Sequence, residues 1–247
     1  MAKMIDVEYY KMNLKILNEA GIANEDILPI TYINSSAEVK AEVGKMGGYV
    51  CTSSNAFKII NRGLESGKKI FFVPDRCLGQ NFANQIGLKS AVVGVNPIEE
   101  VVAADIICFN GFCSVHQLFT VEDIAFYRKK FPGIKIATHP ECDPAVCAKS
   151  DFVGSTSQII KYVASLDPEQ KVAVGTEFNL VNRLREKNTY VLSSTKPECP
   201  TMNETTIEEL YKVMKSIEDE TFLNEIEVDP EVIEWGGIAL KRMMDLS

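Results

Sequence analysis

The chain has 247 residues, of which 46% are hydrophobic and 24% charged, a composition typical of a globular protein with one large or two ordinary domains. Its net charge of −8, with no block of basic residues, argues against nucleic acid as a partner. No apolar run is long enough for a transmembrane helix, and the first residues lack the layout of a secretory signal. We therefore expect a cytoplasmic protein with no membrane partner.

Short β-rich runs alternate with helical patterns along the chain. The sequence predicts buried strands at Leu28–Ile33, Lys69–Val73, Ile106–Phe109, Ile134–Thr138, Val172–Val174 and Tyr190–Leu192. It predicts helices at Ser36–Val43, Asn55–Glu65, Val121–Lys130, Thr156–Ala164 and Glu177–Glu186. This alternation indicates an α/β fold with parallel sheets covered on both faces, in which functional side chains gather at the carboxyl ends of strands.

Seven cysteines are many for a reducing compartment. An odd number in a chain of this length is a poor basis for a disulfide framework, and no C-x-x-C pair indicates a zinc or thioredoxin-type site. The remaining interpretations of the cysteines are buried thiols, a cluster site whose ligands lie far apart in the sequence, or both. The segment 74–79, which contains Cys77, is interpreted as a turn with an incidental thiol.

A repeat divides the chain into two similar α/β units. In the first, the strand end Tyr32-Ile33-Asn34 is followed by a helix and then by Ser53. In the second, His139-Pro140-Glu141 is followed by a helix and then by Ser155-Thr156. The run from Lys69 to Asp75 also matches the run from Lys171 to Glu177.

A second repeat concerns two cysteines at predicted strand ends. Cys113 and Cys199 are each followed seven residues later by a threonine that suits a helix N-cap, with acidic residues in the first turn. Asp6 fits the same template, which places a matching cysteine two positions before Met1. We therefore expect three cysteine-bearing units, and this chain contains two of the three cysteines. Two units are expected at 1–112 and 113–199, followed by a C-terminal helical segment at 200–247 that is expected to pack on the missing unit.

The cysteines suit the binding of an iron–sulfur cluster, and the hydroxyl residues at strand ends suit the binding of anions. Three thiolates on a four-iron cluster leave one iron open as a Lewis acid, and Cys113 and Cys199 are candidate ligands. Ser53 and Thr156 stand where a strand end meets a helix, a place that binds carboxylate or phosphate, although plain N-capping is the simpler interpretation of either one.

Only two histidines occur. His139, with Glu141 beside it at a strand end, is the better candidate for acid–base chemistry, whereas His116 is interpreted as a donor near the cluster. Tyr32 and Asn34 hold the corresponding place in the first unit and suit binding of a carboxylate or carbonyl. No nucleotide-binding glycine motif is present.

Eight stretches spread over nearly the whole chain resemble quinolinate synthases. They are ITYINSSAEVKA, VCTSSNA, FFVPDRCLG, GFCSVHQLFTVEDI, THPECDPAV, DFVGSTSQIIKY, VGTEFNLVNRL and ECPTMNETTIEEL. The resemblance implies three-layer α/β/α units with short parallel sheets, arranged around a [4Fe–4S] cluster. It also implies condensation of iminoaspartate, supplied by an L-aspartate oxidase, with dihydroxyacetone phosphate to give quinolinate for NAD biosynthesis.

The resemblance also assigns roles to residues. Cys113 and Cys199 are implied to be cluster ligands. The implied contacts to the dicarboxylate substrate are Tyr32, Ile33, Asn34, Ser53, His139, Pro140, Glu141 and Thr156. Of these, Glu141 is expected to move protons, and His139 and Tyr32 to orient or polarise the substrate.

The family's first unit, which carries a further cluster cysteine, has no counterpart in this sequence. The closing helix from Val228 resembles one that packs on that unit, so we expect its apolar face to lack a partner. A truncated reading frame is the favoured interpretation, with little activity expected of the chain alone. The alternatives are a subunit of a split enzyme and a non-catalytic dicarboxylate-binding protein.

Overall fold

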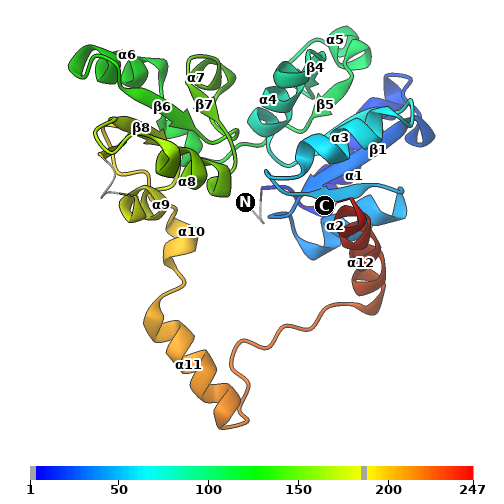
Figure 1. The fold of residues 1–247 in the computed structure, drawn as a ribbon. Coiled ribbons are helices and arrows are strands. Elements are labelled where there is room, and N and C mark those ends of the chain that lie inside the picture. The colour runs from blue at the N-terminus through cyan, green and yellow to red at the C-terminus, as the bar shows by residue number, and fades with distance from the viewer. Residues whose placement is uncertain (1–3, 185–187, 247) are drawn as a thin grey trace.

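The computed structural model describes residues 4–184 and 188–246, which form two α/β units side by side (Figure 1). All strand pairs in both sheets are parallel. The first sheet has the order β2-β1-β3-β5-β4. Its strands are β1 (Ile27–Tyr32), β2 (Tyr49–Cys51), β3 (Lys69–Val73), β4 (Ser90–Val92) and β5 (Ile106–Cys108). The second has the order β7-β6-β8-β9. Its strands are β6 (Lys135–Thr138), β7 (Phe152–Val153), β8 (Val172–Gly175) and β9 (Thr189–Val191).

Helices cover both faces of the first sheet, because its strands are apolar on both sides. One face packs against α1 (Val7–Glu19), α2 (Ala37–Lys45) and α5 (Ile98–Ala103). The other packs against α3 (Ala56–Leu64) and α4 (Arg76–Ile86). A short 3₁₀ turn at Asn24–Asp26 leads into β1. Strands buried on both faces are typical of parallel sheets.

The second sheet is covered in the same way. A 3₁₀ turn at His116–Leu118 precedes the first helix of this unit. One face packs against α6 (Val121–Lys130) and α7 (Pro144–Ala148). The other packs against α8 (Thr156–Ser165) and α9 (Phe178–Arg183). The predicted class of three-layer α/β/α units with short parallel sheets is thus confirmed, and β2-β1-β3 and β7-β6-β8 share one order.

Two predicted elements differ from the structure. The segment at 74–79, interpreted as a turn, is the start of α4, which Asp75 caps by accepting the Leu78 amide at 2.8 Å. The helix predicted over Glu177–Glu186 is α9 and ends at Arg183. The predicted end at Glu186 lies outside the described residues.

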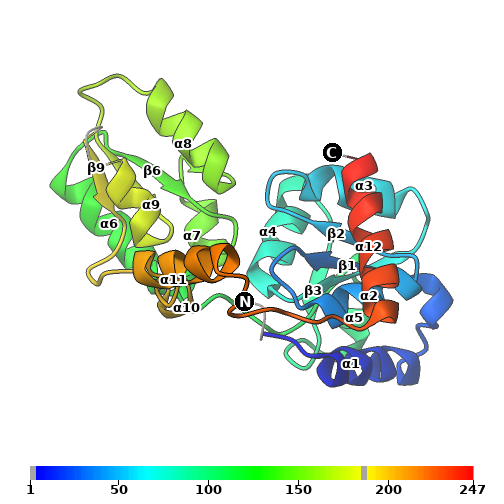
Figure 2. The ribbon, with the colours of Figure 1, turned by 90° about the horizontal axis from the view of Figure 1, so that it is seen from below.

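The C-terminal segment contains α10 (Pro200–Asn203), α11 (Ile207–Glu218) and α12 (Pro230–Asp245). An extended stretch leads from α11 back to the first unit, where α12 packs on α2 and β2 (Figures 1 and 2). The expectation that this closing helix would find no partner within the chain is therefore corrected.

Small residues explain why α12 lies so close to α2. A Cβ atom on Gly44 would overlap the carbonyl oxygen of Trp235, and Ala239 is fully buried at the same contact. The guanidinium of Arg242 also donates to the carbonyl oxygens of Gly44 and Gly48, both at 3.1 Å. These groups dock α12 by close backbone approach and by capping the carboxyl end of α2.

Helix α11 contacts the rest of the chain much less. Five of its apolar side chains are more than half exposed: Ile207 (80%), Leu210 (55%), Tyr211 (68%), Met214 (60%) and Ile217 (54%). Within the described ranges, every helix is too short or too polar to cross a membrane.

Two glycines test the docking of α12. We expect Gly44→Ala to lower the free energy of unfolding by about 1–3 kcal/mol, because the new methyl group forces the two helices apart. Gly237→Ala, where a Cβ meets nothing within 4 Å, should instead stabilise by about 0.5–1 kcal/mol. Urea unfolding followed by fluorescence of Trp235, the single tryptophan, measures both changes, and equal effects of the two variants would contradict this packing.

Candidate functional site

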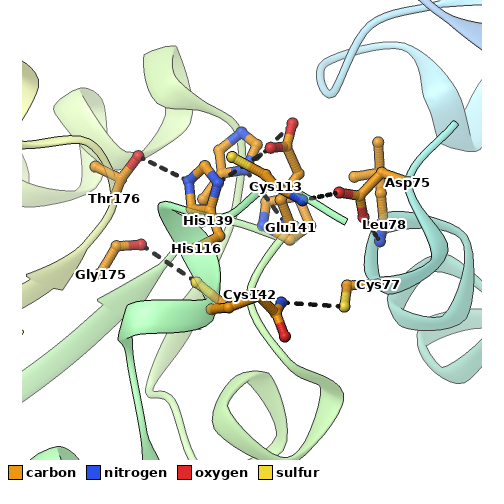
Figure 3. Close-up of polar contacts among 12 residues, drawn as sticks. Asp75, Cys77, Leu78, Cys113, His116, His139, Glu141, Cys142, Gly175 and Thr176 are labelled. Atoms are coloured by element: carbon orange, nitrogen blue, oxygen red, sulfur yellow. Dashed lines mark hydrogen bonds and ion pairs between the residues drawn. The ribbon is translucent and has the colours of Figure 1, made fainter. Parts of the chain in front are cut away.

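The carboxyl ends of strands from both sheets meet where the two units face each other (Figure 3). Asp75 follows β3 of the first unit, while His139 follows β6 and Thr176 follows β8 of the second. Cys113 lies on the segment that connects the units. Because the strands within each sheet are parallel, each sheet brings its loop residues to one edge.

The side-chain amide of Asn81 joins the two units at this point. Asn81 lies on α4, is 3% exposed, and donates to the carbonyl oxygens of Pro140 at 2.7 Å and Cys142 at 2.8 Å. Helix α4 also packs against α7, which begins just after this loop. The first unit thereby holds the loop that carries Glu141.

Glu141 is a buried carboxylate between two histidines. It is 2% exposed, its Oε2 lies 3.0 Å from His116 Nδ1, and its Oε1 lies 4.0 Å from His139 Nδ1. The two imidazole rings stack, with centroids 4.8 Å apart. The contact with His116 rests on charge, because the buried Nδ1 of His116 has no hydrogen-bond partner of good geometry among the described residues.

The three groups differ in protonation. Burial would raise the pKa of Glu141, but His116 and His139 beside it outweigh burial and hold the pKa below its ordinary range. Burial would lower the pKa of His116, but the Cys113 thiol and Glu141 outweigh it and raise the pKa to about 10. Burial lowers the pKa of His139 to about 4. Near neutral pH the site therefore holds an ionised Glu141, a charged His116 and a neutral His139.

The neutral His139 has a defined tautomer. The backbone N–H of Glu141 donates to His139 Nδ1 at 3.3 Å, so the ring proton sits on Nε2. The other histidine meets a hydroxyl, since Nε2 of His116 lies 3.4 Å from Thr176 Oγ1.

Cys113 completes the group. Its Sγ, one ring nitrogen of His116 and one oxygen of Glu141 all lie within 4.8 Å of one another, which is close enough to hold a metal ion. The thiol is half-buried, so it is open to a ligand from outside. The buried Nδ1 of His116, which lacks a hydrogen bond, lies beside Glu141, and the donor set fits a metal ion when the imidazole gives up its proton on binding.

Asp75 supports this group from the first unit. It is fully buried and accepts the backbone amide of Cys113 at 2.9 Å. Burial raises the pKa of Asp75 to about 7, an effect reinforced by the charge of Glu141 and opposed by the amides of Leu78 and Cys113. Asp75 is thus a hydrogen-bond acceptor directly behind the candidate ligand.

Tyr32 and Ser53 lie at the carboxyl ends of β1 and β2. Both are side chains of the first unit, and the Ser53 side chain is near enough to the Tyr32 hydroxyl to lower its pKa slightly against the larger effect of burial. Burial, together with the charge of Glu141, raises the pKa of Tyr32, so the hydroxyl stays protonated. The backbone leaves β1 here, where the amide of Ile33 donates to the Cys51 carbonyl at 2.8 Å and Asn34 follows in a turn.

The two remaining predicted site residues lie apart from this group. Cys199 is half-buried and is not part of the metal-capable group, the one group of its kind in the described ranges. Thr156 is the exposed first residue of α8, and Ser155 rather than Thr156 caps that helix, in a capping box with Gln158.

Three residues gain importance only in the structure. Sequence reasoning placed His116 near the cluster but missed its contact with Glu141, and it overlooked Asp75 and Asn81. For Asp75 a signal existed, namely its match to Glu177 in the repeat. For Asn81 there was none, because its partners Pro140 and Cys142 lie in the other unit.

The two histidines should titrate far apart. His116 has a folded pKa above its ordinary 6.5, so its stabilising effect is complete below pH 6.5 and is lost as the pH rises toward about 10. His139 has a lowered pKa, so stability is lost as the pH falls below 6.5 toward about 4. Because the chain has two histidines, proton NMR of the imidazole signals measures both, and two titrations near pH 6.5 would contradict this site.

Asn81 should matter more than a neighbour of the same type. Asn81→Asp leaves the carbonyl oxygens of Pro140 and Cys142 without donors, and we expect a loss of about 1–3 kcal/mol in the free energy of unfolding. Asn84→Asp, at an exposed position of the same helix, should change it by less than about 0.5 kcal/mol. Urea unfolding with amide hydrogen exchange over residues 139–142 tests this, and unchanged exchange in Asn81→Asp would refute it.

Comparison with known proteins supplies the family. The model of the family described as Quinolinate synthetase A protein matches residues 1–245. A quinolinate synthase of Helicobacter pylori (strain HPAG1) is 56% identical over 251 residues, which cover 100% of this chain and 74% of that protein. A quinolinate synthase of Streptomyces coelicolor is 39% identical over 263 residues, covering 100% of this chain and 66% of that protein. With a family model that spans nearly its whole length and relatives this similar, the chain belongs to the quinolinate synthetase A family, which are enzymes of NAD biosynthesis.

Proposed function

We propose that the chain is part of an enzyme that catalyses the condensation of iminoaspartate with dihydroxyacetone phosphate to quinolinate, with loss of phosphate and water. An L-aspartate oxidase is the proposed supplier of iminoaspartate. The seven cysteines, all free thiols, suit the reducing conditions of the cytoplasm. The observation that carries the proposal is the buried, ionised Glu141 between two histidines, beside the half-exposed thiol of Cys113.

Cys113 and Cys199 are the proposed ligands of a [4Fe–4S] cluster. Both thiols are half-buried, whereas the other five cysteines are buried. When bound, such a cluster supplies a Lewis-acidic iron for an oxygen or hydroxyl group of the substrate. The buried Nδ1 of His116 and the carboxylate of Glu141 make the surroundings of Cys113 polar, as a charged substrate requires.

The residues of the chain itself divide the proton chemistry. Glu141 is ionised and is the proposed base, while the charged His116 beside it keeps it so. His139, neutral with its proton on Nε2, is a donor that orients or polarises a carbonyl without adding charge. The protonated Tyr32 is a second donor from the opposite unit.

Substrate carboxylates are proposed to lie between the two units. Hydroxyl groups and backbone amides at strand ends bind anions without net positive charge. The proposed contacts are Tyr32, Ile33, Asn34, Ser53, His139, Pro140, Glu141 and Thr156. Tyr32 is influenced by both Ser53 and the charge of Glu141, which supports a substrate site shared by the two units.

Variants of Glu141 and Cys113 separate acid–base catalysis from cluster binding. After anaerobic reconstitution with iron and sulfide, we expect Glu141→Gln to keep the visible absorbance of the cluster but to lower quinolinate formation by roughly 10²–10⁴-fold, the usual range for a lost acid–base group. Cys113→Ser should lose both absorbance and product. Cys108→Ala, at a buried thiol on β5, should keep both.

The outcomes distinguish the alternatives. Quinolinate formation that survives Glu141→Gln would refute the assigned base. Binding of quinolinate without any cluster or turnover in the unmodified chain would favour a non-catalytic dicarboxylate-binding protein.

A further inference from the structure

A carboxylate stands behind each of the two half-exposed cysteines. Asp75 comes directly after β3 and uses both of its oxygens: Oδ1 accepts the Leu78 amide at 2.8 Å, and Oδ2 accepts the Cys113 amide at 2.9 Å. One carboxylate thus caps α4 and holds the backbone of Cys113, which lies 38 residues further along the chain.

The second unit contains the same arrangement. Glu177 comes shortly after β8, which corresponds to β3 in the repeat, and it caps α9 by accepting the Asn179 amide on Oε2 at 2.8 Å. Its other oxygen, Oε1, accepts the backbone amide of Cys199 at 3.5 Å. Two cysteines in different parts of the chain therefore have the same kind of support.

A carboxylate suits this task better than a neutral side chain. Two amide donors arrive from different segments, and a carboxyl group offers an acceptor oxygen to each, whereas an Asn or Gln side chain has a single oxygen. The amino end of the capped helix also favours negative charge. An amide substitution therefore leaves one of the two N–H donors without its partner.

We propose that Asp75 and Glu177 are equivalent positioning residues, each fixing the backbone of one cysteine to the start of the helix that it caps: Asp75 holds Cys113, and Glu177 holds Cys199. The significance of this support for a cluster rests on the proposed function, because it assumes that these two thiols are the ligands. The support itself is a property of the polypeptide. It predicts that each carboxylate controls one cysteine and not the other.

Alkylation of the iron-free chain tests the pairing. Cys113 and Cys199 are half-buried and the other five thiols are buried, so iodoacetamide under native conditions should label these two first. We expect Asp75→Asn to raise the labelling rate of Cys113 by roughly three- to tenfold, as one charge-assisted hydrogen bond is lost, and to leave Cys199 unchanged. Glu177→Gln should do the reverse, with a smaller effect because its contact is longer and Glu177 is half-buried.

Two further variants serve as controls, with peptide mass spectrometry as the readout. Asp229→Asn removes a carboxylate that caps α12 through the Glu231 amide at 2.8 Å, far from either cysteine in the sequence, and should change neither rate. Asp75→Glu keeps two acceptor oxygens and should restore much of the protection of Cys113. A purely structural role would raise both rates together, and that result, or no change in either variant, would overturn the proposal.

A measurement on the unmodified chain tests the same hydrogen bonds without relying on the folding of any variant. In a chain labelled with ¹⁵N-cysteine, the amide protons of Cys113 and Cys199 should exchange with solvent more slowly than those of an unstructured peptide, although both residues are half-exposed. Exchange at the unprotected rate would refute the proposal. Because none of these experiments uses iron or turnover, they can fail while quinolinate formation succeeds, and the reverse.

Discussion

The buried hydrogen bonds of Asn81 are the constraint on which the candidate site depends. Its amide group donates to two carbonyl oxygens of the opposite unit, in a place that water does not reach. Buried carbonyl groups without donors are costly, so the contact defines how the loop around Glu141 lies against α4. The residues that meet here come from elements of two separate sheets, and the packing of α4 on α7 accompanies this contact.

The contact between the two units also explains why the buried Glu141 can carry a charge. A buried carboxylate is stable only with compensation, and His116 supplies it from the connecting segment at 3.0 Å. His139 stacks on His116 but stays neutral, because burial and the neighbouring positive charge both disfavour a second proton. One cluster of side chains therefore holds a base, a charged histidine and a neutral donor, and the protonation of each is determined by its surroundings rather than by its residue type.

The internal repeat explains which features come in pairs. Equivalent strand ends carry Asp75 and Glu177, and each caps a helix while it holds a cysteine amide. The units are not identical in environment, since Asp75 is fully buried and Glu177 only half-buried. The C-terminal helices differ as well. Helix α12 docks on α2 through glycine and alanine, whereas the apolar side chains of α11 stay exposed.

The sequence by itself determined the α/β class, most strands, the repeat and the family resemblance, because these follow from local periodicity and from residues in order along the chain. It also singled out Cys113, His139 and Glu141, which stand at strand ends. It misread the start of α4 as a turn, since Pro74 and Gly79 resemble turn residues when the capping role of Asp75 is not considered. Only the tertiary structure decided that Glu141 pairs with His116, that Asn81 holds the loop and that α12 packs on α2. Each of these contacts joins residues distant in sequence, and their energies depend on burial and on charges that no local pattern records.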